Sequence, residues 1–181
     1  MKKFQVKPAN YHSAEDSKAL VFLLNAYALD PMGGGQALSL EASSHLCADL
    51  AHISGAVSFI AWQLPASAAE PASGAAAQTS TSLALEPIGL INCFEGYSTF
   101  KAKPLLNVHD IAVLPAFRGQ GVGQALLQAA QDHAHARGCC KLTLEVLSGN
   151  HPALQSYRRF GFAQYELDPN AGQAQFMQKW L

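Results

Sequence analysis

The chain has 181 residues, 49% of them hydrophobic, which suffices for one domain with a buried core but not for two of ordinary size. Its 12 Lys and Arg residues nearly balance 13 Asp and Glu residues, and the net charge of −1 excludes the strongly basic surface that tight binding to nucleic acid or to an anionic membrane requires. The N-terminus is basic but no apolar run follows it, and no stretch approaches the roughly 18 apolar residues of a membrane span, so we expect a soluble protein of the cytoplasm.

The first third of the chain predicts one short strand and two helices. Residues 4–7 alternate between apolar and polar as a strand does. Ser13 has the position of an N-cap, and the leucines that follow at helical spacing predict a helix that ends before Asp30. The glycine-rich residues 32–35 form a connector, and Ser39 is the N-cap of a second helix.

The middle of the chain predicts three more strands. Residues 57–63 and 83–93 are rich in β-branched and aromatic residues, which favours strands. Between them, residues 65–80 consist largely of Ala, Ser, Gly and Pro without apolar periodicity, so we expect a flexible insertion near 65–80. An aromatic segment with charges of both signs, residues 94–104, leads into a fourth strand over residues 105–113.

The stretch from residue 111 to residue 124 predicts the end of this strand, a turn and the start of a helix. Gly119, Gly121 and Gly123 stand at alternate positions, where the missing side chains let the backbone approach a ligand closely. The amides of a helix's first turn have no partners within the helix. Such a turn is an anion site suited to phosphate.

Spacing excludes two common phosphate-binding motifs. The G-x-G-x-x-G fingerprint of dinucleotide-binding proteins would need a glycine where this chain has Gln124 or Leu126. A Walker loop would need Gly-Lys-Ser/Thr at the turn, but no lysine stands between Lys103 and Lys141.

The last third of the chain alternates helices and strands. The most regular helical pattern follows Gly121 and is capped by Gly138. Residues 142–146 alternate as a fifth strand, and a shorter helix is expected between Asn150 and Gly161. Two terminal strands are expected at residues 163–167 and 173–180.

The phosphate-binding turn resembles the acyl-CoA loop of the GNAT acetyltransferase superfamily. That loop has the pattern Arg/Gln-x-x-Gly-x-Gly/Ala, which Arg118, Gly121 and Gly123 fill here. In the family, consecutive backbone amides of the loop hold the pyrophosphate of CoA.

A second motif of the same family follows the loop. Asn150, Ala153, Tyr157 and the Phe-Gly-Phe turn at residues 160–162 resemble the closing GNAT motif, which has Asn, a small residue, Tyr and an aromatic-Gly-Phe turn. With the preceding strand, the two motifs cover residues 107–162, about a third of the chain.

The resemblance implies an α/β fold of the GNAT type, with one domain over residues 1–181. The sheet would be mixed, mostly antiparallel and seven-stranded, with about four helices, and its fourth and fifth strands would splay apart to admit the pantetheine arm of acetyl-CoA, the co-substrate. The residues expected to contact acetyl-CoA are Ile111, Ala112, Val113, Arg118, Gly119, Gln120, Gly121, Val122, Gly123, Gln124 and Asn150.

The resemblance also places Tyr157 and His109 at the reaction. A phenol with a pKa of ~10 is protonated at neutral pH, so Tyr157 could give its proton to the departing thiolate. In the diamine acetyltransferase subgroup, which this region also resembles, a Glu-Asp pair precedes the strand end, and here the pair is His109-Asp110. Strand alternation would turn the two side chains to opposite faces. The base could be His109, Asp110 or a water, and His109 could equally be a packing residue.

These residues predict an acetyl-CoA-dependent N-acetyltransferase that moves the acetyl group directly to a primary amine of a small molecule. The expected acceptor lining, residues 31–35 and 94–104, has Asp30 and Glu95 beside it or within it but also two lysines, so the acceptor stays open. A homodimer is a family-level expectation. Two alternatives remain: a non-catalytic acyl-CoA-binding regulatory domain, and an acetyltransferase that acts on a protein amine.

The sequence predicts no metal site. The 4 cysteines have no Cys-x-x-Cys spacing and stand in apolar patterns, which indicates reduced thiols. His133 and His135 are two positions apart in a helical pattern and therefore point to different faces of the helix.

Overall fold

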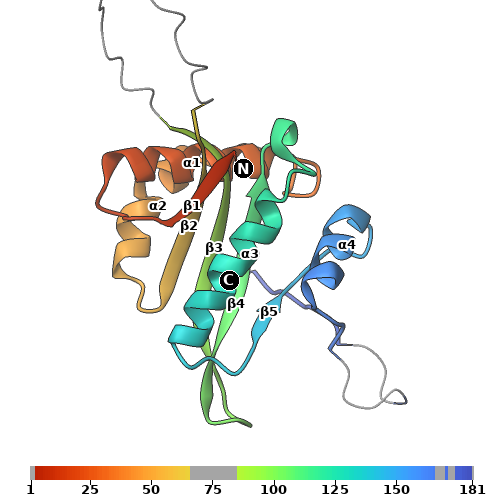
Figure 1. The fold of residues 1–181 in the computed structure, drawn as a ribbon. Coiled ribbons are helices and arrows are strands. Elements are labelled where there is room, and N and C mark those ends of the chain that lie inside the picture. The colour runs from red at the N-terminus through yellow and green to blue at the C-terminus, as the bar shows by residue number, and fades with distance from the viewer. Residues whose placement is uncertain (1–2, 66–84, 166–169, 171–173, 181) are drawn as a thin grey trace, which may run out of the picture.

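The computed structural model describes residues 3–65, 85–165, 170 and 174–180 (Figure 1). In chain order, its elements are β1 (Phe4–Pro8), α1 (Ala14–Leu29), α2 (Leu40–His52), β2 (Ala56–Gln63), β3 (Glu86–Ser98), β4 (Lys103–Val113), the 3-10 turn η1 (Pro115–Phe117), α3 (Val122–Ala136), β5 (Leu142–Leu144) and α4 (His151–Phe160). The described residues thus form an α/β fold with four α-helices and one sheet. This agrees with the predicted α/β class and with the predicted number of about four helices.

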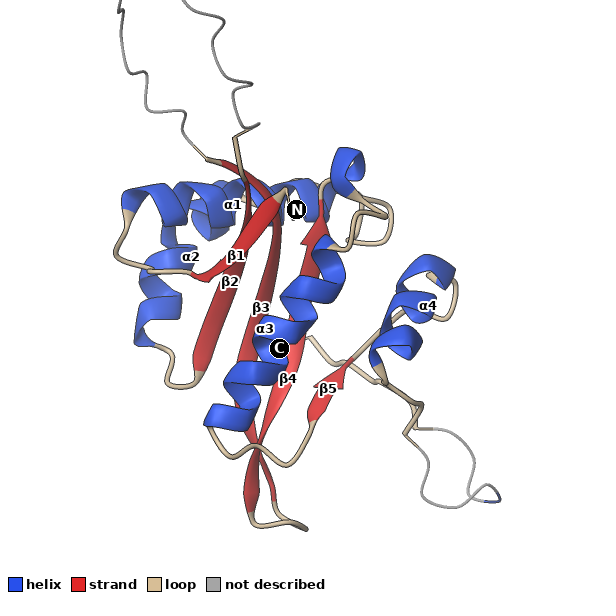
Figure 2. Ribbon diagram, in the orientation of Figure 1, coloured by secondary structure: helices blue, strands red, loops and turns tan. Residues whose placement is uncertain are grey.

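The five strands of the sheet lie side by side in sequence order, β1-β2-β3-β4-β5. Neighbouring strands are antiparallel except β4 and β5, which are parallel and are connected through α3. Helices α1 and α2 cover one face of the sheet, and α3 covers the other (Figure 2). The sheet is therefore mixed and mostly antiparallel, as predicted.

Alternation along β2 supplies both layers of the core. Ile60 and Trp62 belong to the buried cluster beneath α1 and α2, whereas Phe59 and Ala61 belong to the cluster beneath α3. From α3, Leu126 is fully buried in the second cluster. Two apolar layers thus hold the middle strands in place from both sides.

The polar residues predicted to cap helices do so. At Ser13, Ser39 and Asn150 the side-chain oxygen accepts a hydrogen bond from the backbone N–H three residues later, at 3.0–3.3 Å. Gly161 ends α4 in the left-handed region, with a φ of 106°. Hydrogen bonds to side chains within three residues, and a glycine in left-handed backbone, therefore determine these helix ends.

The prediction of seven strands was not confirmed, because the described residues form five. Residues 163–165 and 174–180 are described and are not in strands, while residues 166–169 and 171–173 lie outside the described part. Phe176 and Met177 are adjacent in sequence and are 77% and 84% exposed. Adjacent apolar residues would face opposite sides of a strand, so this segment does not present one apolar face for burial.

One other predicted boundary differs, and one prediction is not tested. Strand β5 ends at Leu144 and not at residue 146, because its pairing with β4 stops there. Of the predicted insertion near 65–80, all residues after Pro65 lie outside the described part of the chain.

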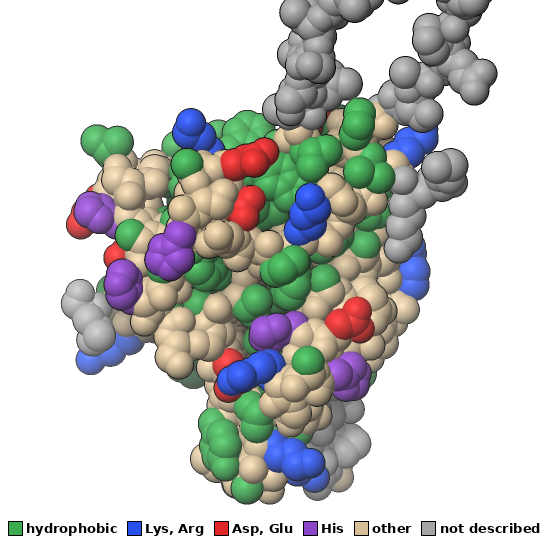
Figure 3. Space-filling model, turned by 60° about the vertical axis from the view of Figure 1, so that its left-hand side comes forward, with side chains coloured by type: hydrophobic (Ala, Val, Ile, Leu, Met, Phe, Trp, Pro, Cys, Tyr) green, Lys and Arg blue, Asp and Glu red, His purple; other side chains and the backbone are tan. Residues whose placement is uncertain are grey.

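Charged side chains are interspersed over the face shown in Figure 3, where acidic and basic groups alternate without a large patch of either sign. This agrees with the nearly equal counts of 12 basic and 13 acidic residues. Within the described residues, none of the helices is long and apolar enough to span a membrane.

Candidate functional site

The strands β4 and β5 splay apart where the sequence predicted a slot for the pantetheine arm. Strand β5 pairs with β4 only over residues 106–108, and the rest of β4 up to Val113 has one open side (Figure 2). The N–H of Leu114 donates to the carbonyl of Ile88 at 2.9 Å, so the backbone hydrogen-bonding groups of Leu114 point toward β3. Because the direction of these groups alternates along a strand, the N–H and C=O groups of Ile111 and Val113 point toward the open side.

The loop that follows β4 has the geometry of an anion site. Gly119 and Gly121 have φ angles of 75° and 85°, in the left-handed region that favours glycine. Gly121 is the N-cap of α3 and offers no side-chain acceptor, so no cap takes up the first amides of this helix. An open hollow of about 780 Å³ borders the loop on the side of β1, where Lys3 and Phe4 line it together with Gln120, Gly121 and Gln124. It is therefore distinct from the open side of β4.

Two predicted donor-site side chains already have protein partners. The amide of Gln124 donates to the hydroxyl oxygen of Ser156 on α4 at 2.9 Å, which ties α3 to α4. Asn150 accepts from the N–H of Ala153 as the cap of α4. In these two residues, the backbone amide of Gln124 and the side-chain amide of Asn150 can still donate to a ligand.

The guanidinium of Arg118 binds protein groups on both sides of the loop. Its Nε donates to the carbonyl oxygen of Val113 at 3.0 Å, and its Nη2 lies 2.9 Å from Oδ2 of Asp30. The backbone N–H of Met32 and the guanidinium together lower the pKa of the Asp30 carboxyl below its usual value. Arg118 therefore joins the connector after α1 to the end of β4.

A β-bulge at His109 sets the directions of the two candidate bases. Asp110 pairs with Asn92, but Val108 pairs with the next β3 residue, Cys93, so His109 is the extra residue. The rings of His109 and Phe94 meet edge to face, with centroids 5.4 Å apart.

The predicted opposite orientation of His109 and Asp110 is therefore wrong. Asp110 bonds to Asn92 and His109 contacts Phe94, and these two β3 residues are two positions apart and share one face. The bulge breaks the alternation on which the prediction depended. Both side chains lie on the face that α1 and α2 cover, with His109 exposed and Asp110 partly buried.

Tyr157 lies on α4, partly buried against the core beneath α3 and edge to face with Phe162, at 5.9 Å between ring centroids. Burial, and to a lesser degree the nearby Tyr27, raise the pKa of Tyr157 to about 12. The phenol is therefore fully protonated at neutral pH.

Sequence reasoning missed Tyr27, a half-buried residue in the last turn of α1. Burial raises the pKa of its phenol, and the charges of Asp110 and Asp30 raise it further. Tyr27 on α1 therefore interacts electrostatically with Asp110 on β4 and with Tyr157 on α4. No spacing in the sequence signals the contact, because α1 and β4 are about 80 residues apart.

The aromatic and charged segment at residues 94–104 does not form a lining at this site, apart from Phe94. It belongs to the β3–β4 hairpin, and Glu95 forms an ion pair with Arg137 at 3.0 Å near the end of α3. Lys103 begins β4 and lies six residues before His109, which is roughly 20 Å along the strand at about 3.3 Å per residue. Glu95 is therefore removed from the expected acceptor lining.

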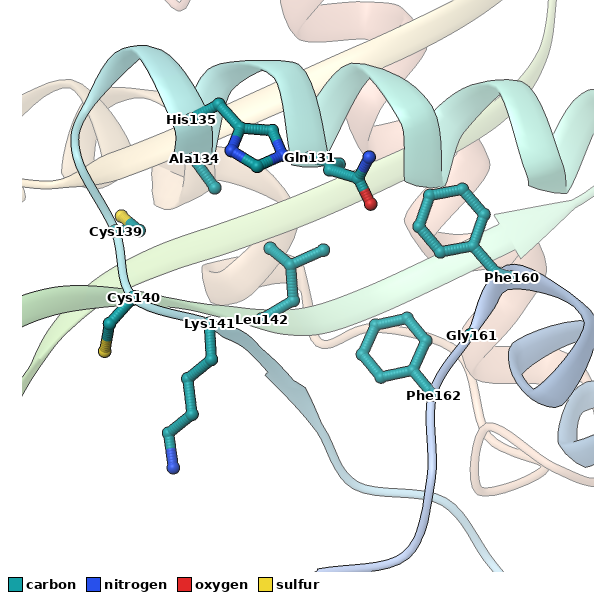
Figure 4. Close-up of a pocket in the computed structure, with 10 residues that line it drawn as sticks. All are labelled: Gln131, Ala134, His135, Cys139, Cys140, Lys141, Leu142, Phe160, Gly161 and Phe162. Carbon is teal, nitrogen blue, oxygen red and sulfur yellow. The ribbon is translucent and has the colours of Figure 1, made fainter.

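A cavity of about 250 Å³ lies beneath the second half of α3 and not at the anion loop (Figure 4). Phe160 and Phe162 approach it from one side, and Cys139 and Lys141 stand on the other. It is thus separate from the predicted donor site. In the described parts of the chain, no group of three or more His, Cys, Asp or Glu side chains could hold a metal ion.

The model of the Acetyltransferase (GNAT) family matches residues 54–162, more than half of the chain. The chain belongs to the GNAT acetyltransferase family. The family resemblance predicted from the two motifs is confirmed.

Curated relatives of this GNAT protein include other acetyltransferases. Streptothricin acetyltransferase of Streptomyces lavendulae is 39% identical over 97 residues, 54% of this chain and 51% of that protein. Thialysine N-epsilon-acetyltransferase of Bos taurus is 37% identical over 65 residues, 36% of this chain and 38% of that protein. The matched region thus spans about half the length of the first relative and less of the second.

Solved structures share the GNAT fold over almost the whole chain. An aminoglycoside acetyltransferase from an uncultured soil metagenomic sample superposes with a TM-score of 0.66 at 15% identity, covering 99% of this chain and 95% of that one. The aminoglycoside N-acetyltransferase AAC(6')-Iy superposes with a TM-score of 0.68 at 16% identity, covering 98% and 99%. At these identities the likeness shows the fold alone.

Proposed function

We propose that this GNAT protein transfers the acetyl group of acetyl-CoA directly to the primary amine of a small, cationic molecule. The single observation that carries the proposal is the open side of β4, which ends at the glycine loop, next to Asp110 and His109 on the sheet face that α1 and α2 cover. We take this face as the acceptor side. Acetyl-CoA supplies an activated thioester. Everything else in the reaction is binding, orientation and proton movement by the chain itself.

The donor would be held mainly by backbone. The outward groups of Ile111 and Val113 would pair with the amides of the pantetheine arm, and the amides of residues 119–124 would bind the pyrophosphate. The N–H of Val113 is also the candidate donor to the carbonyl oxygen as charge develops on it. The fit of the group rests on the left-handed glycines and on a strand edge that β5 leaves unpaired.

Proton movements follow from the side chains at the splay. The acceptor amine must lose one proton before it attacks, and His109 or Asp110 would receive it. Tyr157 would donate a hydrogen bond to the departing sulfur. With a pKa of about 12 against ~8.5 for a thiol, complete transfer from Tyr157 would be uphill by about 5 kcal/mol. The phenol would therefore stabilise the thiolate by a hydrogen bond, and the thiolate would take the second proton of the amine, which the nitrogen loses as the amide forms.

The acceptor class is argued from charge and from the relatives. Asp110 is a carboxylate on the acceptor side, and a carboxylate suits an ammonium group. The named relatives acetylate streptothricin and thialysine, and the two solved structures hold sisomicin and the bisubstrate analogue CoA-S-monomethyl-acetylneamine. A small molecule with a primary amine is the acceptor that best fits both observations.

Release of free CoA thiol from acetyl-CoA, measured with a panel of polyamines, aminoglycosides and amino acids, tests the proposal. We expect turnover with at least one cationic amine, and a loss of about 10–100-fold in kcat for Tyr157→Phe. Tyr97→Phe is the matched control, because Tyr97 is 63% exposed on the β3–β4 hairpin. Tight acetyl-CoA binding without turnover would indicate a binding domain, and turnover only with peptides would indicate a protein acceptor.

A further inference from the structure

Three polar side chains form a row across the sheet at the level of the bulge. Ser58 on β2, Asn92 on β3 and Asp110 on β4 are direct register partners. Their neighbours on the same face, Ile60 and Leu90, are fully buried beneath α1. The row therefore interrupts an otherwise apolar face and leads from the core to the open end of β4.

Every hydrogen bond along this row points toward Asp110. Ser58 Oγ donates to Asn92 Oδ1 at 2.6 Å, and Asn92 Nδ2 donates to Asp110 Oδ2 at 3.0 Å. The hydroxyl of Tyr11 lies 2.9 Å from Ser58 Oγ, and since the single proton of Ser58 is already used, Tyr11 must be the donor. We call Tyr11, Ser58, Asn92 and Asp110 the polar row.

This arrangement defines the state of Asp110. The amide nitrogen of Asn92 can only donate, so Oδ2 of Asp110 is an acceptor and carries no proton toward Asn92. A reversed amide would place two oxygens against each other at the carboxylate. Among the described residues, none donates to the other carboxylate oxygen, Oδ1, and Asp110 is only partly buried.

The row is too deeply buried to be an incidental surface contact. Ser58 is 1% exposed and Asn92 is 4% exposed. Buried polar groups destabilise a fold unless each finds a partner, whereas apolar side chains of the same size would need none. If the row served packing alone, a carboxylate at its end, beside the bulge, would give no advantage in stability.

We propose that Asn92, supported by Ser58 and Tyr11, is a positioning residue that aims Asp110 at the acceptor amine. This inference rests on the proposed function. Oδ1 of Asp110 binds the ammonium group and takes one of its protons, so that an N–H bond breaks and an O–H bond forms on Asp110. The neutral amine then attacks the thioester carbonyl: a C–N bond forms, the C–S bond breaks, CoA leaves as the thiolate, and the thiolate takes the second proton that the nitrogen loses. His109, exposed on the bulge, is then not the base.

A double-mutant cycle between Asn92 and Asp110 tests the proposal. Asn92→Leu keeps the size of the side chain and removes the hydrogen bond, and we expect it to lower kcat/KM for the amine by about 10–100-fold, with the Kd for acetyl-CoA within about twofold of wild type. In an Asp110→Asn background the same change should cost less than about threefold, because the partner it positions is already lost. Equal losses in both backgrounds would overturn the proposal.

Three further variants separate positioning from folding. Asn107→Leu is the matched control, since it also removes an amide that bonds across strands, to Thr143 at 3.1 Å, but it lies outside the polar row. Ser58→Ala should reduce kcat/KM, and Ser58→Thr, which keeps the hydroxyl, should restore it. Rescue by threonine is a result that a general loss of stability would not give. Equal losses for alanine and threonine would contradict the role of Ser58.

A readout without turnover distinguishes failure of this inference from failure of the proposed function. In ¹⁵N-labelled protein with CoA bound, addition of a polyamine or aminoglycoside should shift the side-chain amide resonances of Asn92, and Asp110→Asn should abolish the shift. A shift without thiol release supports the polar row and contradicts the transferase. Thiol release without the shift contradicts the polar row alone.

Discussion

Nη2 of Arg118 lies 2.9 Å from Oδ2 of Asp30, and this contact joins the glycine loop after β4 to the connector after α1. The same guanidinium donates to the carbonyl of Val113, so one side chain holds the end of β4, the loop and the connector together. In the proposed function the loop binds the donor, and the resemblance implies that the connector lies on the acceptor side. The ion pair therefore spans the two halves of the proposed reaction.

Arg118→Gln should show how much this ion pair contributes to stability and at which pH. The Arg118 side chain is 56% exposed in the wild type, so we expect the free energy of unfolding to fall by at most about 1 kcal/mol near neutral pH. The pKa of Asp30 is lowered in the folded state, so its contribution is complete above the unfolded value of ~3.9 and is lost as the pH falls through the folded value. Urea unfolding of both proteins between about pH 3 and pH 6 measures the difference.

The part of the Asp30 shift due to the N–H of Met32 stays in the variant, so only the Arg118 share should disappear. The difference between wild type and variant should be constant above about pH 5 and should shrink toward pH 3. A difference that does not change over this range would show that the ion pair does not stabilise the folded state.

Tyr157→Phe should lower kcat without creating a new alkaline limb or removing one. Burial raises the pKa of this phenol to about 12, so its proton stays in place up to about pH 10. Any fall in rate between about pH 8 and pH 10 must come from another group and should persist in the variant. Measurement of kcat against pH for both proteins checks this. An alkaline limb that is present only in wild type would contradict the raised pKa.

Features set by local chemistry were predictable from the sequence. The serines and the asparagine before α1, α2 and α4 indicated caps, because the partners of these groups are within a few residues. The loop glycines indicated a close approach of the backbone to a ligand, while the left-handed φ angles at 119 and 121 are a finding of the structure. The family was therefore predictable from the loop and the closing motif, whereas the donor-binding roles of the loop residues stay a prediction.

Features that depend on residues far apart in the sequence were not predictable. The bulge at His109 exists only in the pairing of β4 with β3, so alternation along β4 alone gave the wrong faces for His109 and Asp110. Glu95 pairs with Arg137, a residue 42 positions away. One signal was available: Asn92 is a lone polar residue between Ile91 and Cys93, and such a residue in a buried strand requires a partner.

His109→Gln should leave the pH dependence of kcat/KM unchanged and cost less than about threefold in rate. Its ring packs edge to face on Phe94, so the change should instead reduce the free energy of unfolding by about 0.5–1.5 kcal/mol. Asp110→Asn should lower kcat/KM by about 100-fold. Comparison of the two pH–rate profiles decides between the bases. If the acidic limb disappears in His109→Gln and remains in Asp110→Asn, the histidine is the base.

Gly33→Ala should impair binding of the amine more than binding of acetyl-CoA. A Cβ at this position would lie 1.9 Å from the carbonyl oxygen of Tyr27, so the connector would have to move away from the end of α1. That movement would also break the 2.8 Å hydrogen bond from the N–H of Gly33 to the carbonyl of Asp30. Because the connector lies on the proposed acceptor side, KM for the amine should rise several-fold.

Gly149→Ala is the control for Gly33→Ala, because a Cβ at Gly149 would meet nothing within 4 Å. Steady-state kinetics with each substrate varied in turn, together with thermal unfolding, separates the two effects. Through Asp30 and Arg118 the displaced connector could disturb the loop as well, and in that case KM for acetyl-CoA would rise in parallel with KM for the amine. A parallel rise would place the connector in the donor site and would contradict its assignment to the acceptor.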